Sequence, residues 1–478
     1  MAETRIDTGP AQAAPAGPSP ADRRMLAVAL TATFMASFDL FVVNVATEAL
    51  RADLRASDAA LELVVSGYAF AYAAGLITGG RLGDRFGYRR TFVAGMAAFT
   101  VTSLLCGLAQ GPGELVVARL AQGLSAAVMV PQVLSLVTAR FPAAHRGRAT
   151  GWNGAVAGIG SIAGQLVGGV LLQADMLGLG WRAVFLVNVP VGVVASIAAW
   201  RLLPAQLSGP RRRFDALGAL GVTATLALLL LPLTLGRDEG WPAWTWLCLA
   251  AAAPAAWATR RWQQALRARG GDPVLNPTLF GNRPYLTLLA ALGAFQLYFG
   301  AYMFTLALLL QAGLGASPLT AGAVFVPQAV AFTTGSLLSG RLTARRWPVV
   351  GGALVVAGLT LTTVQLTVPD GAIDPWSLTP ALLLTGLGNG LLMPPIIGAA
   401  LSRVTPSTAG SASAMLNTTQ QAASAFGVAL LGTLFFTASG PSLRDARTGM
   451  ATVSGAFAVL VVISTILTWS TRRRATAP

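Results

Sequence analysis

The sequence predicts an all-α polytopic membrane protein. Of its 478 residues, 54% are hydrophobic and only 11% are charged, which is less than half the roughly 25% of charged residues in soluble domains. A membrane-spanning helix needs about 20 apolar residues, and the chain contains fourteen runs of about that length. Arginines gather in alternate segments between these runs. Together these observations exclude a disordered chain and disfavour a water-soluble enzyme.

Each apolar run is predicted to form one transmembrane helix, because polar residues separate it from the next. Residues 1–24, rich in alanine and proline, are expected to be a disordered cytoplasmic tail. Residues 472–478 are expected to be a second cytoplasmic tail. The predicted spans are 26–48, 61–80, 91–110, 114–138, 151–173, 183–203, 215–236, 242–259, 285–311, 318–340, 348–368, 377–401, 407–437 and 449–471.

The distribution of positive charge indicates how the chain crosses the membrane. All 33 basic residues are arginine, and the formal net charge is +15. With a cytoplasmic N-terminus and fourteen crossings, 26 arginines fall in cytoplasmic segments, six in outer segments and one inside a run. Because cytoplasmic loops carry the excess of basic residues, both termini are expected in the cytoplasm. The spread of arginines over short loops disfavours nucleic-acid binding.

Cysteine and histidine are too few and too poorly placed for metal or nucleophilic chemistry. Cys106 and Cys248 lie in apolar runs, and the single histidine, His145, lies among arginines. A zinc site or a Ser-His-Asp triad within the membrane needs a histidine inside an apolar run. We therefore expect no metal, no cofactor and no enzymatic activity.

Two charged residues inside apolar runs are the leading candidates for function. A charge at the bilayer centre costs roughly 2.5–3.5 kcal/mol on insertion scales, yet Asp39 lies past the middle of the first run and Arg119 early in the fourth. Asp39 is predicted to exchange protons; the alternative is a structural carboxylate in a permanent pair. Arg119 is predicted to couple to an acidic partner; the alternative is a structural bond to backbone carbonyls.

Three glutamates, Glu48, Glu62 and Glu114, lie near the predicted outer ends of runs and are expected to be solvated helix ends. The last six runs contain no charged residue within their predicted spans. An uncharged C-terminal half argues against a highly charged substrate.

A glycine- and arginine-rich turn follows the second run. It reads Gly80-Arg81-Leu82-Gly83-Asp84-Arg85-Phe86-Gly87-Tyr88-Arg89-Arg90. Glycines permit a tight turn, and the carboxylate can form charge-assisted hydrogen bonds that break when helices move. The string resembles the loop signature of the major facilitator superfamily. The resemblance implies a conformational latch formed by Gly80, Asp84, Arg85, Gly87, Arg89 and Arg90.

Further stretches resemble one branch of that superfamily, the fourteen-helix drug:proton antiporters. Phe38 to Ala46 in the first run and Trp181 to Pro190 at the sixth are similar to signatures of this branch. Arg119-Leu120-Ala121-Gln122-Gly123 resembles the arginine motif of the fourth helix. The fifth run is similar to the antiporter motif, with glutamine in place of the usual proline; its members are Gly158, Gly164, Gln165, Gly168 and Gly169.

The resemblance implies a major facilitator fold, in which two six-helix bundles rock about a central substrate site. By this analogy residues 25–204 form the N-terminal bundle, 205–283 a linker with two extra transmembrane helices, and 284–471 the C-terminal bundle. It also implies a monomeric, multi-pass transporter in the plasma membrane of a bacterium. Its partners would be protons, the lipid bilayer and a small-molecule substrate.

The predicted function is proton-coupled efflux of small hydrophobic or aromatic compounds such as antibiotics or drugs. The alternative is a proton symporter or facilitator of the same fold for a small metabolite. Substrate-binding candidates are polar or aromatic residues within apolar runs, for which helix packing is an equally open explanation. They are Asn44, Gln122, Gln296, Tyr298, Phe299, Tyr302, Gln328, Asn389, Asn417 and Gln421.

Overall fold

The computed structural model describes most of the chain between the two tails. Helix α1 begins at Pro20, before the predicted end of the N-terminal tail, because Ser19 and Asp22 form a capping box: the Asp22 amide donates to Ser19 Oγ (3.1 Å) and the Ser19 amide to Asp22 Oδ2 (3.0 Å). The rest of that tail, and residues 475–478 of the other, lie outside the described residues. These are 19–141, 143–175, 178–204, 215–236, 239–275, 277–341, 346–367, 373–404, 409–440 and 445–474.

Helices follow the predicted apolar runs in order. The first six predicted spans are α1 (Pro20–Leu54), α2 (Asp58–Phe86), α3 (Tyr88–Leu108), α4 (Pro112–Arg140), α5 (Ala143–Ala174), and η2 (Gly180–Arg182) with α6 (Ala183–Leu186) and α7 (Asn188–Leu202). The next two are α8 (Ala216–Leu235) and α9 (Ala243–Ala268). The last six are α10 (Arg283–Leu308), α11 (Pro318–Arg341), α12 (Trp347–Thr367), α13 (Thr379–Leu401), α14 (Ala409–Ser439) and α15 (Ala446–Arg474). Three short helical segments flank them: η3 (Pro277–Gly281) before α10, η4 (Leu309–Gly313) after α10 and η5 (Pro375–Leu378) before α13.

Thirteen of the described helical segments are long and apolar enough to cross a membrane. The segment that falls short is α9, the eighth predicted span, although its 26 residues provide the length. Its tryptophans and the arginines that begin at Arg260 lower its hydropathy. The observed number of strongly apolar spans is therefore one below the predicted fourteen.

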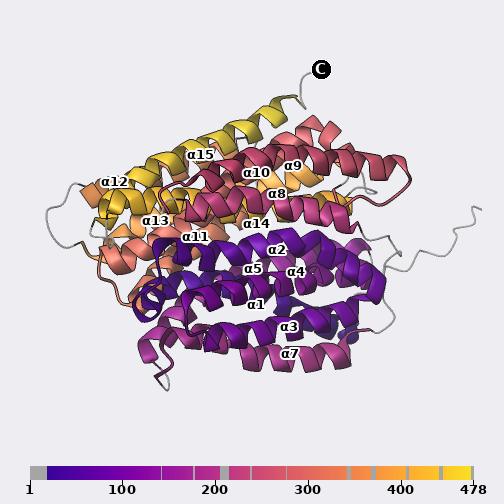
Figure 1. The fold of residues 1–478 in the computed structure, drawn as a ribbon, viewed down its shortest axis with the longest axis horizontal. Coiled ribbons are helices and arrows are strands. Elements are labelled where there is room, and N and C mark those ends of the chain that lie inside the picture. Colours follow the sequence, from indigo (N-terminus) through magenta and orange to yellow (C-terminus); the bar gives the residue numbers. More distant parts are fainter. Residues whose placement is uncertain are drawn as a thin grey trace, which may run out of the picture.

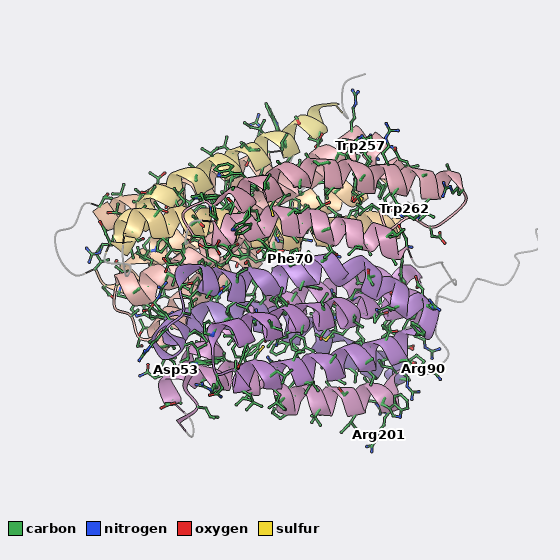
Figure 2. The ribbon with its side chains drawn as sticks, in the orientation of Figure 1. Asp53, Phe70, Arg90, Arg201, Trp257 and Trp262 are labelled. Atoms are coloured by element: carbon green, nitrogen blue, oxygen red, sulfur yellow. The ribbon has the colours of Figure 1, made fainter. Side chains whose placement is uncertain are left out.

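Two helical bundles lie side by side (Figure 1). One contains α1 to α7, coloured indigo to magenta, and the other contains α10 to α15, coloured rose to yellow. Helix α8 packs on α2 of the first bundle and α14 of the second, and α9 packs on α8. Arg90 and Arg201 lie at one end of the helices and Asp53 at the other (Figure 2). We call these the arginine end and the Asp53 end.

The two bundles pack against each other mainly toward the Asp53 end. One buried apolar cluster includes Leu50 and Leu61 of the first bundle together with Leu308 and Phe435 of the second. A second cluster lies toward the arginine end and contains residues of the first bundle alone, such as Met25, Tyr88, Phe141 and Leu203. Contact between the bundles is therefore extensive at the Asp53 end.

The extra helices are tied to the first bundle at the arginine end by a segment that we call the strap, residues 272–274. Asp215, the N-cap of α8, accepts hydrogen bonds from the Gly218 amide (2.8 Å), Trp262 Nε1 (2.8 Å), Gln263 Nε2 (2.9 Å) and the Val274 amide of the strap (3.2 Å). Burial raises the pKa of the Asp215 carboxyl, but these four bonds outweigh it and hold the pKa below its ordinary value.

Arg81 completes this connection from α2. Its guanidinium donates to the carbonyl oxygens of Asp272 (2.6 Å) and Pro273 (2.5 Å). The glycine- and arginine-rich turn thus contacts the chain segment that leads from α9 into the second bundle.

Asp215→Ala is expected to lower the thermal midpoint of the purified protein by several degrees, because each buried donor left without a partner costs about 1–3 kcal/mol. The Asp215 carboxylate stabilises the fold above its unfolded-state pKa, and that contribution is lost as the pH falls through the lower folded-state value. Glu239→Ala removes a carboxylate with one exposed bond, to Trp244, and serves as the control. Equal midpoints for both variants at neutral pH would contradict this role.

Candidate functional site

A buried ion pair joins α1 to α4. Asp39 and Arg119 are both fully buried, with 0% of either side chain exposed. Arg119 Nη1 donates to Asp39 Oδ2. The other carboxylate oxygen, Oδ1, accepts from Gln122 Nε2 (2.8 Å) and from Asn188 Nδ2 of α7 (2.9 Å). Every oxygen of the carboxylate is therefore bonded, and the bonds come from two other helices.

The guanidinium of Arg119 is held by a second set of contacts. Its Nε donates to the carbonyl of Val64 in α2 (2.9 Å), and its Nη1 also donates to Gln122 Oε1 (2.8 Å). The ring of Tyr68 lies 4.4 Å from the guanidinium carbon, which gives a cation–π contact. Arg119 thus bonds both to an acid and to a backbone carbonyl, and its predicted coupling role stays a prediction.

Several residues of this site, among them Asn188, Ser103 and Tyr68, were not among the sequence candidates. Asn188 binds the Asp39 carboxylate, and Ser103 Oγ accepts from Gln122 Nε2 (2.7 Å). Asn188 is an amide within the sixth apolar run, and the same reasoning that selected Asn44 could have selected it. Ser103 carries no comparable signal, because single serines are common in transmembrane helices.

The expectation for Glu62 was wrong. It was predicted to be a solvated helix end, but only 1% of it is exposed. Its carboxylate oxygens lie 3.4 Å from Thr433 Oγ1 of α14, beside Gly432, where the absence of a side chain leaves room for them. Glu114, by contrast, is exposed and accepts from the Gln110 amide (2.9 Å). Glu62 is buried because its end of α2 faces the second bundle. Hydropathy along the sequence does not show which helix ends do so.

The predicted latch spans the last two turns of α2, the junction at Gly87 and the first turn of α3, so most of the turn expected from the sequence is helical. Gly87 has φ 91°, a left-handed value that suits glycine. The carboxylate of Asp84 accepts from the Tyr88 hydroxyl (3.0 Å), and the guanidinium of Arg89 lies 4.4 Å from the ring of Trp200 in α7. Among the described residues, the hydrogen bond that the Asp84 carboxylate accepts comes from the hydroxyl of Tyr88 and not from an arginine.

The remaining latch residues differ in their surroundings. A Cβ atom added to Gly80 would lie 3.8 Å from Cβ of Pro131 in α4, so this face of α2 packs on α4. The guanidinium of Arg85 lies 5.2 Å from the ring of Phe86, and both side chains are exposed. Arg90 is exposed at the arginine end (Figure 2).

The glycines of α5 set how closely it approaches two neighbours. A Cβ atom on Gly164 would lie 2.5 Å from the carbonyl oxygen of Phe38, and one on Gly168 would lie 2.7 Å from Val42 Cγ2, both in α1. A Cβ atom on Gly169 would lie 2.5 Å from the carbonyl oxygen of Pro318 in α11. Gly158 has open space around it. The glycine motif is therefore a close-packing surface for α1 and α11, and Gly158 faces elsewhere.

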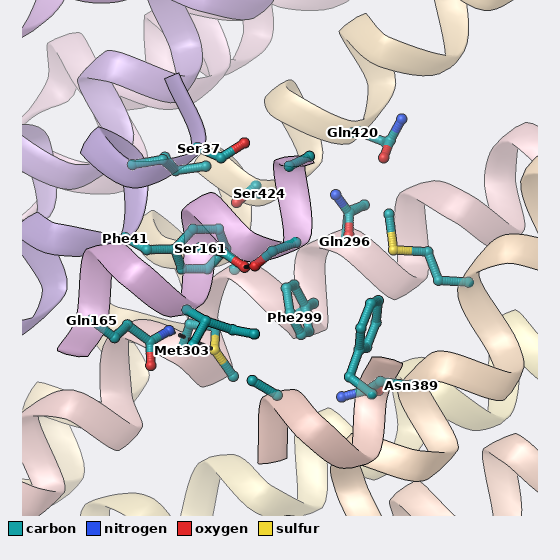
Figure 3. Close-up of a pocket in the computed structure, with 18 of the residues that line it drawn as sticks. Ser37, Phe41, Ser161, Gln165, Gln296, Phe299, Met303, Asn389, Gln420 and Ser424 are labelled. Carbon is teal, nitrogen blue, oxygen red and sulfur yellow. Dashed lines mark hydrogen bonds between the residues drawn. The ribbon is translucent and has the colours of Figure 1, made fainter. Parts of the chain in front are cut away.

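A cavity of about 910 Å³ lies between the two bundles (Figure 3). Gly158 and Gln165 of α5 belong to its wall. Wall residues toward the arginine end are exposed, such as Leu337 at 63%, whereas Asn389, deeper along the helices, is fully buried. Because the bundles pack together at the Asp53 end, the cavity opens toward the arginine end.

The wall includes seven of the ten substrate-binding candidates: Asn44, Gln296, Phe299, Gln328, Asn389, Asn417 and Gln421. The other three lie elsewhere. Gln122 belongs to the ion-pair site, since its side chain bonds to both Asp39 and Arg119. Tyr298 and Tyr302 are fully buried behind the wall, where their rings pack against Phe457.

Two bundles of membrane-spanning helices around a central cavity define a polytopic membrane transporter of small molecules. The family model of the Major Facilitator Superfamily matches residues 29–428. The chain belongs to this superfamily, as the turn after α2 and the arginine motif of α4 had suggested.

Curated relatives with similar sequences span most of the chain. It is 38% identical over 427 residues to a probable actinorhodin transporter of Streptomyces coelicolor, an alignment that covers 88% of this chain and 74% of that protein. It is 37% identical over 470 residues to the cephamycin export protein CmcT of Amycolatopsis lactamdurans, with 93% of both chains covered. It is 34% identical over 474 residues to the puromycin resistance protein pur8 of Streptomyces alboniger, with 95% and 92% covered.

Solved structures show the same fold at low sequence identity. A bacterial homologue of the human lysosomal transporter Spinster matches with a TM-score of 0.68 at 16% identity, covering 96% of this chain and 98% of that one. A bacterial homologue of the human drug peptide transporters PepT1 and PepT2 matches with a TM-score of 0.67 at 15% identity, covering 95% and 99%.

Gly164→Ala is expected to lower the thermal midpoint and to reduce transport strongly, because the added methyl group has no room against the carbonyl of Phe38. Gly455→Ala of α15 is the control, since nothing lies within 4 Å of its Cβ position and Gly455 does not line the cavity. Midpoints are measured on purified protein and transport in proteoliposomes. A tolerated alanine at position 164 would show that α1 and α5 are not closely packed there.

Proposed function

We propose that this protein exports small aromatic or hydrophobic antibiotics from a bacterial cytoplasm in exchange for protons. Its relatives support this substrate class, since one is a probable actinorhodin transporter, and the cephamycin export protein supports the direction. The arginine asymmetry supports a plasma-membrane orientation with the arginine end, and hence both termini, in the cytoplasm. The transporter acts as a monomer without a cofactor, and the proton gradient supplies the energy.

The observation that carries proton coupling is the position of Asp39 on α1. Ser37, Leu40, Phe41 and Asn44 of the same helix line the cavity, and Asp39 does not. At 3.6 residues per turn these four lie roughly 100° to 160° around the helix axis from Asp39. One helix thus carries the ion pair on one face and part of the substrate wall on the other.

This arrangement supports indirect coupling through α1. Protonation of Asp39 from the outside removes the charge that attracts Arg119, so the bond between α1 and α4 weakens. The helix can then change its position, and the wall that it contributes moves with it. Release of the proton to the cytoplasm restores the pair. The proton and the substrate therefore bind at different residues, and the movement of α1 makes their binding mutually exclusive.

The proton gradient supplies enough free energy for useful export. One charge that crosses a potential of 100 mV provides about 2.3 kcal/mol, which corresponds to a concentration ratio of roughly fifty-fold. A pH difference of the same sign adds to this figure.

A symporter of the same fold is the second candidate, and proteoliposomes distinguish the two. For exchange, an acidic lumen drives accumulation of substrate inside the vesicle. For symport, accumulation requires protons to enter together with the substrate. The absence of any gradient-driven accumulation across a panel of hydrophobic antibiotics would overturn the proposal.

Asp39→Asn is expected to abolish accumulation driven by an imposed pH difference while substrate still binds, because Asp39 lies outside the cavity wall. The amide keeps the size of the carboxyl, and its oxygen can still accept from Gln122 and Asn188. Arg119 then remains buried without its counter-charge, so the yield and thermal midpoint of the variant, measured beside those of the parent protein, separate a loss of coupling from a loss of fold. Gradient-driven transport at the parental rate would remove Asp39 from the coupling role.

Arg119→Ala is expected to reduce transport at least about tenfold, because a buried carboxylate that loses its partner is strongly destabilised, by about 3–5 kcal/mol. Arg201→Ala, at an exposed arginine of α7, should retain nearly full transport and controls for loss of charge. Similar mild losses in the two variants would reduce Arg119 to a packing residue.

A further inference from the structure

The wall of the central cavity is electrically neutral. Among the described residues that line it, none is an aspartate, glutamate, arginine or histidine. The nearest charged pair along α1, Asp39 with Arg119, is sealed off with no exposed surface. A charged ligand would therefore lose its hydration without gaining an opposite charge in return.

Unpaired amide oxygens line the same cavity. The side-chain carbonyls of Asn44 and Gln165 in the first bundle, and of Gln296 and Asn389 in the second, have no hydrogen-bond partner within the protein. None of these four residues is more than 9% exposed. Buried acceptors without a donor are rare in folded proteins, so these oxygens point to a ligand that supplies one.

The nitrogen ends of two of these amides already have contacts, which orients the oxygens. Asn389 Nδ2 donates to the Tyr298 hydroxyl (3.2 Å), and Gln165 Nε2 lies 3.8 Å from Met303 Sδ, as the dashed line in Figure 3 marks. In both amides the side-chain oxygen is therefore the acceptor that is left for a ligand in the cavity. A ligand that has only acceptors, such as an ether or a ketone, could not satisfy them.

Aromatic side chains from both bundles belong to the same cavity wall. Phe41 comes from the first bundle, and Phe299, Phe325 and Phe332 come from the second. Phenyl faces and edges pack well against a flat ring system. The cavity thus combines surfaces for an aromatic core with acceptors on both of its sides.

We propose that the cavity is selective for uncharged aromatic molecules that carry hydroxyl or amide N–H donors at two separate edges, one for the oxygens of each bundle. This inference rests on the proposed export function and specifies its substrate by hydrogen bonding. Asn44 and Gln165 hold one edge, Gln296 and Asn389 hold the other, and the bound molecule bridges the two bundles. Removal of the donors should cost affinity even when size and hydrophobicity are kept.

Equilibrium binding to the purified full-length protein tests this selectivity. The probes are anthraflavic acid, an anthraquinone with one hydroxyl at each end, and its dimethyl ether, at a mildly acidic pH that keeps the hydroxyls protonated. Tetraphenylphosphonium serves as an aromatic cation without donors. The hydroxyl compound should bind at least about tenfold more tightly than the ether, and the cation should bind no better than the ether.

Two near-isosteric variants, Gln296→Met and Asn389→Leu, remove one amide oxygen each. Each is expected to weaken binding of anthraflavic acid and to leave binding of the ether unchanged. Gln365→Met is the control, because Gln365 of α12 also has an unpaired side-chain oxygen but does not line the cavity. Thermal midpoints of all three variants, measured in parallel, identify any that fail to fold, and the hydroxyl-to-ether ratio of the parent protein needs no variant.

Equal binding of the hydroxyl compound and the ether would overturn the inference, as would a preference that neither variant changes. Gradient-driven uptake into proteoliposomes is measured on the same preparations. If uptake of antibiotics persists while the donor preference is absent, only this inference fails. If no compound is accumulated, the proposed function fails and the inference with it.

Discussion

The bond between Asp39 and Arg119 is the constraint on which the rest of the first bundle depends. Two opposite charges without any exposed surface must lie close together, because each would be severely destabilised alone in a low-dielectric interior. Their pairing fixes the rotation of α1 about its axis. The opposite face of that helix, with Phe41 and Asn44, is consequently directed into the cavity.

Charge is thus separated from the substrate cavity in this molecule. The ion pair lies on one side of α1, the arginines of the turn after α2 lie at one end of the bundle, and the cavity between the bundles has a neutral wall among its described residues. On the proposed function, a neutral substrate contributes nothing to the charge moved in each cycle. The proton is then the charge carrier, so the membrane potential and the pH difference would both drive export.

The fold could be predicted from the sequence because its determinants are local. Apolar run length and arginine placement act along the chain, so the helices follow the predicted runs, and the turn around Gly87 was recognisable from its residues. The site was harder to predict, because the direction of a side chain around its helix depends on neighbours that are distant in sequence. Tyr298 and Asn389 illustrate this: both are polar residues in apolar runs, yet one lies behind the cavity wall and the other lines it.

The same limit explains Glu62 and Asn188. A glutamate one turn from a helix end is usually solvated, and only the approach of α14, with glycine at position 432, buries it. Asn188 reaches Asp39 across a separation of 149 residues. The glycines of α5 have one more consequence. A Cβ atom at Gly164 would meet the backbone of α1, and one at Gly168 would meet the side chain of Val42, so α1 and α5 are in close contact at both glycines. On the proposed function, a displacement of α1 therefore carries α5 with it, and with α5 the Gln165 side chain of the cavity wall.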